Sequence, residues 1–284
     1  MSDTQKEMYM SSFSRVLMAT DLSRQSANMT DGLTSLCPDG DTTVVLAHVF
    51  DDEEDADPRS SQYQKVIQEL ENYRNDLVRE GYHDLKIVTA VGDPAEQIHR
   101  LTEANDADLI FVASHGKGFI RSAIMGHSTT YDLAREALQP IYIDKDDEDA
   151  KENILSNVLI ATDFSKKSLQ ALDIVRELRA KVEHVLFVHV IEAADDTTVE
   201  DANTFLQELV DELKMFGIQA DYKVTEGVAS QEIIRIAEAE HCQIITMSKT
   251  GAGANDLDPL GSTAKNLLMK AECALLLMPD VDDD

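Results

Sequence analysis

The sequence RVLMATDLS at residues 15–23 returns as NVLIATDFS at residues 157–165, 142 positions further along the chain. In both copies a short apolar run ends in Thr-Asp, and a serine follows two residues after the aspartate. A short apolar run that is bounded by turn residues is typical of a buried strand. Each copy therefore predicts a buried strand followed by a turn that carries a carboxylate.

Further blocks repeat in the same order along the chain. AHV at 47–49 returns as VHV at 188–190, residues 103–116 align with residues 238–251, and Gly126 aligns with Gly261. The order of the blocks is unchanged, and the number of residues that separates each block from its repeat varies little. This pattern indicates one domain that has been duplicated.

Each half alternates short β-rich runs with stretches of helical length. The apolar runs are 16–19, 44–50, 85–91, 109–113 and 141–143 in the first half, and 158–161, 185–191, 222–224, 244–247 and 275–278 in the second. Residues 62–79 and 199–216 are long enough for helices, and the second stretch has leucine and valine at i, i+3, i+4 and i+7. We therefore predict an α/β fold of two tandem, open, twisted, five-stranded parallel sheets with helices on both faces.

The limits of the repeats divide the chain into five segments. We predict an N-terminal extension at 1–12, a first domain at 13–145, an acidic linker at 146–154, a second domain at 155–279 and an acidic tail at 280–284. The linker is rich in charge and contains neither Pro nor Gly, which is typical of a solvated segment.

Composition excludes several classes of function. The chain has 284 residues, of which 43% are hydrophobic, and a formal net charge of −29. Such a charge repels nucleic acid and anionic lipid, so we expect neither as a partner. No apolar window reaches the ~18 residues that span a membrane, and the polar N-terminus lacks the pattern of an export signal. The three widely spaced cysteines suit neither a disulfide framework nor a zinc site. We therefore expect a cytoplasmic protein.

Two interpretations of the acidity stay open. A strongly negative surface can serve solubility alone. It also suits life in high salt, where the Debye length falls to about 3 Å and self-repulsion is screened. Lysine is not unusually scarce beside arginine, which weighs against a saline habitat.

Asp21 and Asp163 are the first candidate functional residues. Ligands of open α/β sheets bind beyond the carboxyl ends of the strands, and both aspartates follow the first strand of their half. One interpretation is that each carboxylate caps a helix. The other is that it contacts the sugar or base of a ligand.

Glycine-bearing loops follow the fourth strand of each half. The first loop contains Gly116 and Gly126, and the second contains Gly251 and Gly261, with nine residues between the glycines in each case. Glycines let the backbone approach a phosphate closely, and a following helix start presents free N–H groups. Such loops also occur simply as turns.

The ATDxS starts, the (A/V)HV strands and the two loops together resemble the universal stress protein family in a tandem form. The resemblance covers about residues 13–145 and 155–279. It implies a five-stranded parallel α/β fold of the adenine nucleotide alpha hydrolase type. One branch of the family binds ATP through a G-x2-G-x9-G-(S/T) loop. The resemblance therefore implies ATP or ADP as the ligand, with Mg²⁺ as a candidate counter-ion.

The resemblance also assigns roles to particular positions. The phosphate-contacting positions would be Gly116, Gly126 and Ser128 in the first half, and Gly251, Gly261 and Ser262 in the second. The adenosine-contacting positions would be Asp21, Val49, Asp163 and Val190.

Both halves depart from the family pattern. Ala113 and Ser248 stand where the first glycine is expected. His127 stands where a hydroxyl residue is expected, so Ser128 would take that role after a slip of one residue. In the second half, Asp256 and Asp258 would repel a triphosphate.

The first half instead offers the cations Lys117 and Arg121 beside His127, and we favour it for phosphate binding. The alternatives are that His127 is an ordinary loop residue and that the two cations form a solvated face. His48 and His189 recur at matching places, and we interpret them as strand histidines with satisfied hydrogen bonds.

No catalytic machinery stands out in the sequence. It has no supported Ser/His/Asp order, no histidine pair at metal-ligand spacing and no Walker lysine, so we expect at most slow ATP hydrolysis. Two functions remain: a nucleotide-binding stress-response or regulatory protein, or a scaffold of the same family that binds protein partners. In the family, the last strands of two domains pair. We therefore expect an intramolecular pseudo-dimer through 141–143 and 275–278, and a homodimer stays open.

Overall fold

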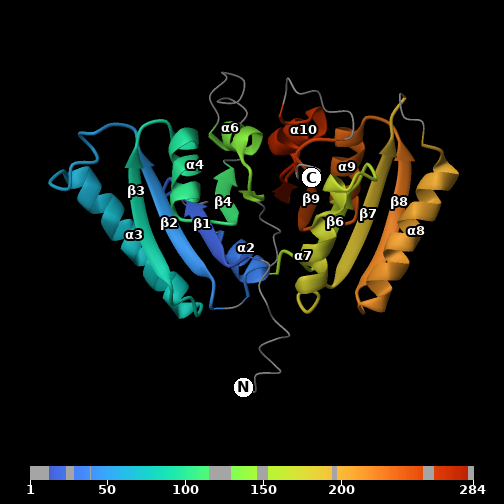
Figure 1. Cartoon of the computed structure of the whole chain (residues 1–284), viewed down its shortest axis with the longest axis horizontal. Coiled ribbons are helices and arrows are strands. Elements are labelled where there is room, and N and C mark those ends of the chain that lie inside the picture. Colours follow the sequence, from blue (N-terminus) through green and yellow to red (C-terminus); the bar gives the residue numbers. More distant parts are fainter. Residues whose placement is uncertain are drawn as a thin grey trace, which may run out of the picture. The chain divides into compact units, whose positions relative to one another are not determined.

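The computed structural model describes residues 13–23, 29–38, 40–114, 129–145, 153–193, 197–251 and 259–280. The chain divides into two compact units, Met1–Asp146 and Asp147–Asp284, called here the first and the second unit (Figure 1). One copy of the sequence repeat lies in each unit.

The first unit is an open parallel sheet. Its strands are β1 (Arg15–Ala19), β2 (Thr43–Phe50), β3 (Leu85–Val91), β4 (Leu109–Ser114) and β5 (Ile141–Lys145). Its helices are α2 (Met29–Leu36), α3 (Ser61–Arg79), α4 (Pro94–Ala104) and α6 (Thr129–Glu136). The strand order is β3-β2-β1-β4-β5, and the neighbouring strands pair in parallel.

The second unit repeats this arrangement. Its strands are β6 (Asn157–Ala161), β7 (His184–Ile191), β8 (Gln219–Glu226), β9 (Ile244–Ser248) and β10 (Ala274–Met278). Its helices are η2 (Lys167–Leu169), α7 (Ala171–Glu177), α8 (Val199–Met215), α9 (Ala229–Ala239) and α10 (Ser262–Lys270). The strand order is β10-β9-β6-β7-β8, again with parallel pairs.

Chain direction determines which helices cover which face of each sheet. In the second unit the strands run outwards from β6 to β8, and the chain then returns past β6 to form β9. Right-handed crossovers therefore place α7 and α8 on one face and α9 and α10 on the other. In agreement, α10 packs against α9. The predicted α/β fold with helices on both faces is confirmed for each unit.

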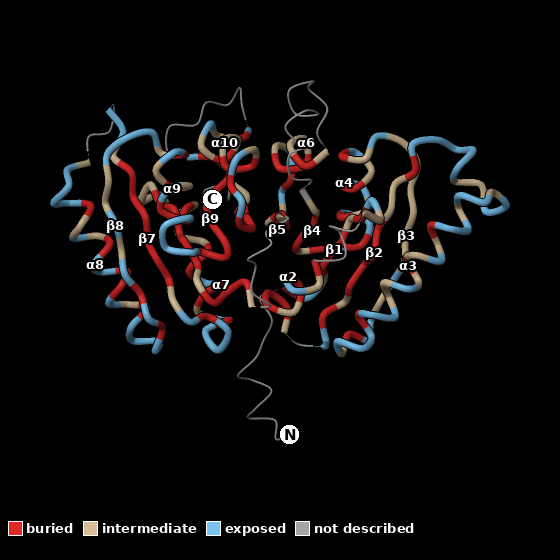
Figure 2. The backbone as a smooth tube through the Cα atoms, turned by 180° about the vertical axis from the view of Figure 1, so that it is seen from behind, coloured by how far each residue is buried: buried red, intermediate tan, exposed pale blue. Residues whose placement is uncertain are grey.

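The core lies along the central strands, as the buried segments in Figure 2 show. Val16, Leu17 and Met18 of β1 are fully buried, and all five residues of β9 are buried. Strands that are covered on both faces are apolar at nearly every position, which explains why apolar runs in the sequence predicted these central strands.

One strand is longer than predicted. We predicted 222–224, whereas β8 spans Gln219–Glu226 and pairs with β7 over eight residues. It lies at the edge of its sheet, and exposed Asp221 and Lys223 alternate with less exposed neighbours. This alternation interrupts the apolar run by which the sequence marked the other strands.

Candidate functional site

The turn after β6 carries Asp163 and is held by its own side chains. The Thr162 hydroxyl oxygen accepts the Phe164 N–H at 2.9 Å. Asp163 Oδ1 accepts both the N–H of Ser165 at 3.1 Å and its hydroxyl at 2.6 Å. Phe164 has a φ of +65°, in the left-handed region that non-glycine residues seldom adopt. These bonds fix the direction of the Asp163 carboxylate at the end of the strand.

The turn after β1 has the same geometry. Leu22 has a φ of +63°, and its N–H donates to the Thr20 hydroxyl oxygen at 3.0 Å. Asp21 Oδ1 accepts the Ser23 N–H at 2.9 Å. In both units the aspartate thus accepts the backbone N–H two residues ahead, which is an Asx turn. In the second unit the next helix, η2, begins only at Lys167, so Asp163 is not its N-cap.

The two repeated histidines lie on the neighbouring strands and face these turns. His48 Nδ1 lies 2.9 Å from the Thr20 carbonyl oxygen, and His189 Nδ1 lies 2.9 Å from the Thr162 carbonyl oxygen. A carbonyl oxygen can only accept, so the network assigns a proton to Nδ1 in each ring. Each histidine therefore has the satisfied hydrogen bond expected of a strand histidine.

Aromatic rings gather beside the Asp163 turn. The Phe164 ring stacks on the His189 ring, with centroids 4.1 Å apart and an interplanar angle of 26°. Phe205 of α8 meets Phe164 edge-on at 4.7 Å. The side chain at the strained position is thus packed into an aromatic cluster, which helps to hold the turn.

Of the two glycines of the loop after β9, Gly251 approaches the same turn and Gly261 approaches the backbone beside Gly251. A Cβ added at Gly251 would lie 3.2 Å from Asp163 Oδ2. A Cβ added at Gly261 would lie 3.3 Å from the Lys249 carbonyl oxygen, which accepts the Gly261 N–H at 2.8 Å. Gly261 is the N-cap of α10, and Ser262 is the first residue of that helix. Here glycine is required by close approach of the backbone rather than by its φ angle.

These groups meet at the switch point of the second unit. Asp163 follows β6 and Gly251 follows β9, which are neighbouring strands with connections on opposite faces. In open α/β sheets this is the place where ligands bind. The structure therefore brings together Asp163, Gly251, Gly261 and Ser262. Val190 lies on β7, two strands away from β9.

Charged side chains that the sequence analysis did not single out surround this point. Lys167 Nζ lies 3.3 Å from Asp280 Oδ1, and the Thr250 hydroxyl donates to the same oxygen. Lys249 is only 7% exposed, which is rare for a lysine. Burial lowers the pKa of Lys249, while nearby Asp280 acts to raise it and Lys167 to lower it. The one available signal was the position of Lys249, directly after a buried strand.

The remaining predicted residues fall into two groups. Asp21 and Val49 are described in the first unit, at the carboxyl ends of β1 and β2. The rest of the predicted first-half site lies outside the described residues, namely Gly116, Lys117, Gly126, His127 and Ser128. The preference for the first half therefore stays a prediction.

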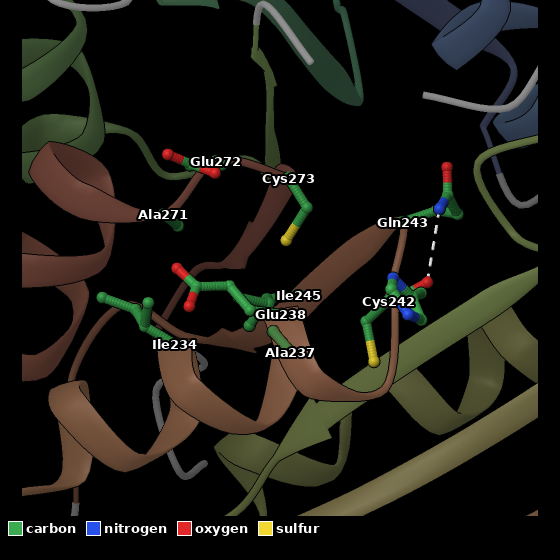
Figure 3. Close-up of a pocket in the computed structure, with 10 residues that line it drawn as sticks. Ile234, Ala237, Glu238, Cys242, Gln243, Ile245, Ala271, Glu272 and Cys273 are labelled. Atoms are coloured by element: carbon green, nitrogen blue, oxygen red, sulfur yellow. Dashed lines mark hydrogen bonds between the residues drawn. The ribbon is translucent and has the colours of Figure 1, made fainter. Parts of the chain in front are cut away.

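A pocket of about 500 Å³ opens at the other end of β9 (Figure 3). The thiols of Cys242 and Cys273 and the carboxylates of Glu238 and Glu272 line it, together with apolar groups of α9 and β9. Burial raises the pKa of Cys242 to about 12, so this thiol stays protonated at neutral pH and is a poor nucleophile. The pocket lies away from the switch point.

Within the described ranges, no helix has the length and hydropathy needed to cross a bilayer. No group of three or more His, Cys, Asp or Glu side chains in those ranges is arranged to hold a metal ion.

The fold and the site define a tandem, doubly wound α/β protein with a glycine-bordered turn at a switch point. The sequence profile of the universal stress protein family matches residues 12–145 and again residues 155–279. The chain therefore belongs to the universal stress protein family, in a tandem form.

Individual relatives agree with this assignment. The universal stress protein MJ0531 of Methanocaldococcus jannaschii is 26% identical over 142 residues, which cover 45% of this chain and 84% of that protein. A universal stress protein from Archaeoglobus fulgidus matches 98% of this chain and 100% of its own, with a TM-score of 0.72 and 20% identity. The functionally unknown protein PA1789 from Pseudomonas aeruginosa matches 96% and 94%, with a TM-score of 0.66 and 16% identity. The two structures have the same fold as this chain.

Proposed function

We propose that this protein binds an adenine nucleotide, ATP or ADP among the candidates, and acts as a nucleotide-responsive stress or regulatory protein. The observation that carries the proposal is the approach of Gly251 to Asp163, with Gly261 packed beside Gly251, at the switch point of the second unit. Family membership supports it, because these positions match those by which one branch of the family binds ATP.

The glycines support a phosphate site. A Cβ at Gly261 would lie 3.3 Å from the Lys249 carbonyl oxygen, so this position leaves little room for a side chain. The first N–H groups of α10 follow directly, and the N-terminus of a helix attracts anions. Lys249 and Lys167 add positive charge at the same end of the sheet.

Asp163 supports an adenosine site. Its Oδ1 is committed to Ser165, while its Oδ2 lies toward the Gly251 backbone. A carboxylate oxygen that is held in place is a suitable acceptor for the hydroxyl groups of a ribose. By the family assignment, Val190 would contact the base, and Asp21 and Val49 would have the same roles in the first unit.

The test is titration calorimetry with ADP and ATP on the parental protein and on Gly126→Val and Gly261→Val. A valine blocks the close approach of the backbone to phosphate, so we expect each variant to lose the binding of its own unit, at least tenfold in affinity or about 1.4 kcal/mol. Gly261→Ala is the milder step, since its single added carbon lies 3.3 Å from the Lys249 carbonyl oxygen. It should retain part of the affinity.

Two results would count against the proposal. If both valine variants bind as tightly as the parental protein, the assigned loops are not the phosphate sites. If acid extraction releases no nucleotide from the purified protein and no binding heat is seen, the scaffold function becomes the better account. Melting temperatures of all variants serve as the control for folding.

A further inference from the structure

The carboxylate of Asp280 lies among the cations of the second-unit site. Its Oδ1 is 3.3 Å from Lys167 Nζ and accepts the Thr250 hydroxyl. It also acts electrostatically on Lys249, which directly precedes Thr250. A residue that the sequence assigned to the acidic tail is therefore part of the region where a phosphate would bind.

Among the described side chains of this region, two cations lie beside two carboxylates. Lys167 and Lys249 are the cations, and Asp280 and Asp163 are the carboxylates that face them or lie beside the glycine turns. Lys249 is buried, which lowers its pKa, and Asp280 acts in the opposite direction. A ligand phosphate would add a second negative charge where Asp280 already supplies one.

We propose that Asp280 makes the second unit bind nucleotides with fewer phosphates more tightly than those with more. The inference rests on the proposed nucleotide function. Coulomb repulsion grows with the charge of the ligand, and a nucleoside triphosphate carries about twice the negative charge of a monophosphate. Asp280 offsets part of the positive charge of the two lysines, so each further phosphate of a ligand meets more repulsion.

The experiment compares AMP, ADP and ATP by calorimetry on the parental protein and on Asp280→Asn. Both proteins also carry Gly126→Val, so that the first unit does not contribute. We expect the parental protein to bind AMP at least tenfold more tightly than ATP. Removing the Asp280 charge should raise the affinity for ATP about tenfold and that for AMP about threefold, because the repulsion it relieves scales with ligand charge.

Two further variants separate this effect from general electrostatics. Glu208→Gln changes the net charge equally on the exposed surface of α8, and it should leave the ratio of AMP to ATP affinity unchanged. Asp280→Glu keeps the carboxylate and should keep the parental preference for AMP.

The outcomes distinguish the two proposals. If the parental protein prefers ATP, or if Asp280→Asn leaves the ratio of affinities unchanged, the role of Asp280 is wrong while nucleotide binding stands. If Glu208→Gln changes the ratio of AMP to ATP affinity as much as Asp280→Asn does, the role of Asp280 is also wrong. If the parental protein binds none of the three nucleotides, the proposed function fails, and this inference fails with it.

Discussion

Burial governs the protonation of two side chains at opposite ends of β9. Lys249 follows the strand in the candidate site, and burial lowers its pKa. Cys242 precedes the strand in the pocket, and burial raises its pKa to about 12. In both cases the environment disfavours the charged form, as expected for groups taken out of water. At the residue scale, the second unit thus holds a buried lysine with a lowered pKa and a thiol that stays neutral.

The shifted thiol makes stability depend on pH. An unfolded cysteine ionises near pH 9.0, whereas native Cys242 keeps its proton up to about 12. Between these values the native state binds more protons than the unfolded state, so stability falls as pH rises. Between pH 8.5 and 10.5 we expect the free energy of unfolding of the parental protein to fall by about 2 kcal/mol more than that of Cys242→Ala. Urea unfolding at the two pH values measures the difference.

Cys242→Val is the matched control, because it also lacks the thiol but fills the site differently. Both variants should show the same reduced slope even if their stabilities at pH 7 differ. Slopes equal to that of the parental protein would mean that Cys242 ionises alike in the native and unfolded states.

Hydroxyl caps define the long helices at the scale of elements. The Ser60 hydroxyl oxygen accepts the Tyr63 N–H at the start of α3. The Thr198 hydroxyl oxygen accepts the Asp201 N–H at the start of α8. The two helices hold equivalent places, between the second and third strands of their units. The duplication therefore preserved the way each helix begins as well as its position.

Replacing the cap of α8 should destabilise the second unit. In Thr198→Ala the Asp201 N–H loses its partner, and such a loss costs about 1 kcal/mol. Thr198→Ser retains a hydroxyl and should cost little. Thr204→Ala is the control within the same helix, since Thr204 is exposed there and alanine is the better helix former. Chemical denaturation that ranks Thr204→Ala as equally destabilising would contradict the capping role.

Net charge is the dominant electrostatic feature of the whole molecule. The chain has 54 acidic residues against 25 Lys and Arg, so by number alone most carboxylates have no basic partner. The described ion pairs that do form are largely exposed, such as Arg100 with Glu96 and Arg79 with Asp76. An exposed pair contributes only about 0–1 kcal/mol. Repulsion among carboxylates should therefore outweigh attraction at low salt.

We accordingly expect the melting temperature to rise with salt. Screening shortens the reach of the repulsion that opposes the folded state. Sodium chloride and sodium sulfate should be compared at matched ionic strength below about half molar, because sulfate also strengthens apolar burial. A rise in both salts indicates screening. Melting temperatures that stay flat or fall in both would show that the acidic surface does not oppose folding, and would remove the argument for a saline habitat.

Local sequence determined much of this protein. The duplication, the central strands and the two aspartate turns could all be predicted, because apolar runs and Thr-Asp-x-Ser turns depend on near neighbours in the chain. Strand β8 was the weaker prediction, since an edge strand alternates polar and apolar residues instead of forming a continuous run. The glycine loops were also visible in the sequence, and the family resemblance added the assignment of particular glycines to phosphate contact.

Only the tertiary structure brought Lys167, Lys249 and Asp280 together around the Asp163 turn. They are far apart in sequence: Lys167 begins η2, Lys249 follows β9 and Asp280 follows β10. Their meeting depends on the strand order, which places β6 beside β9 and β9 beside β10. That order results from covering both faces of the sheet with helices through right-handed crossovers. No local pattern encodes it, and so the charges of the site could not be predicted from the residues that compose it.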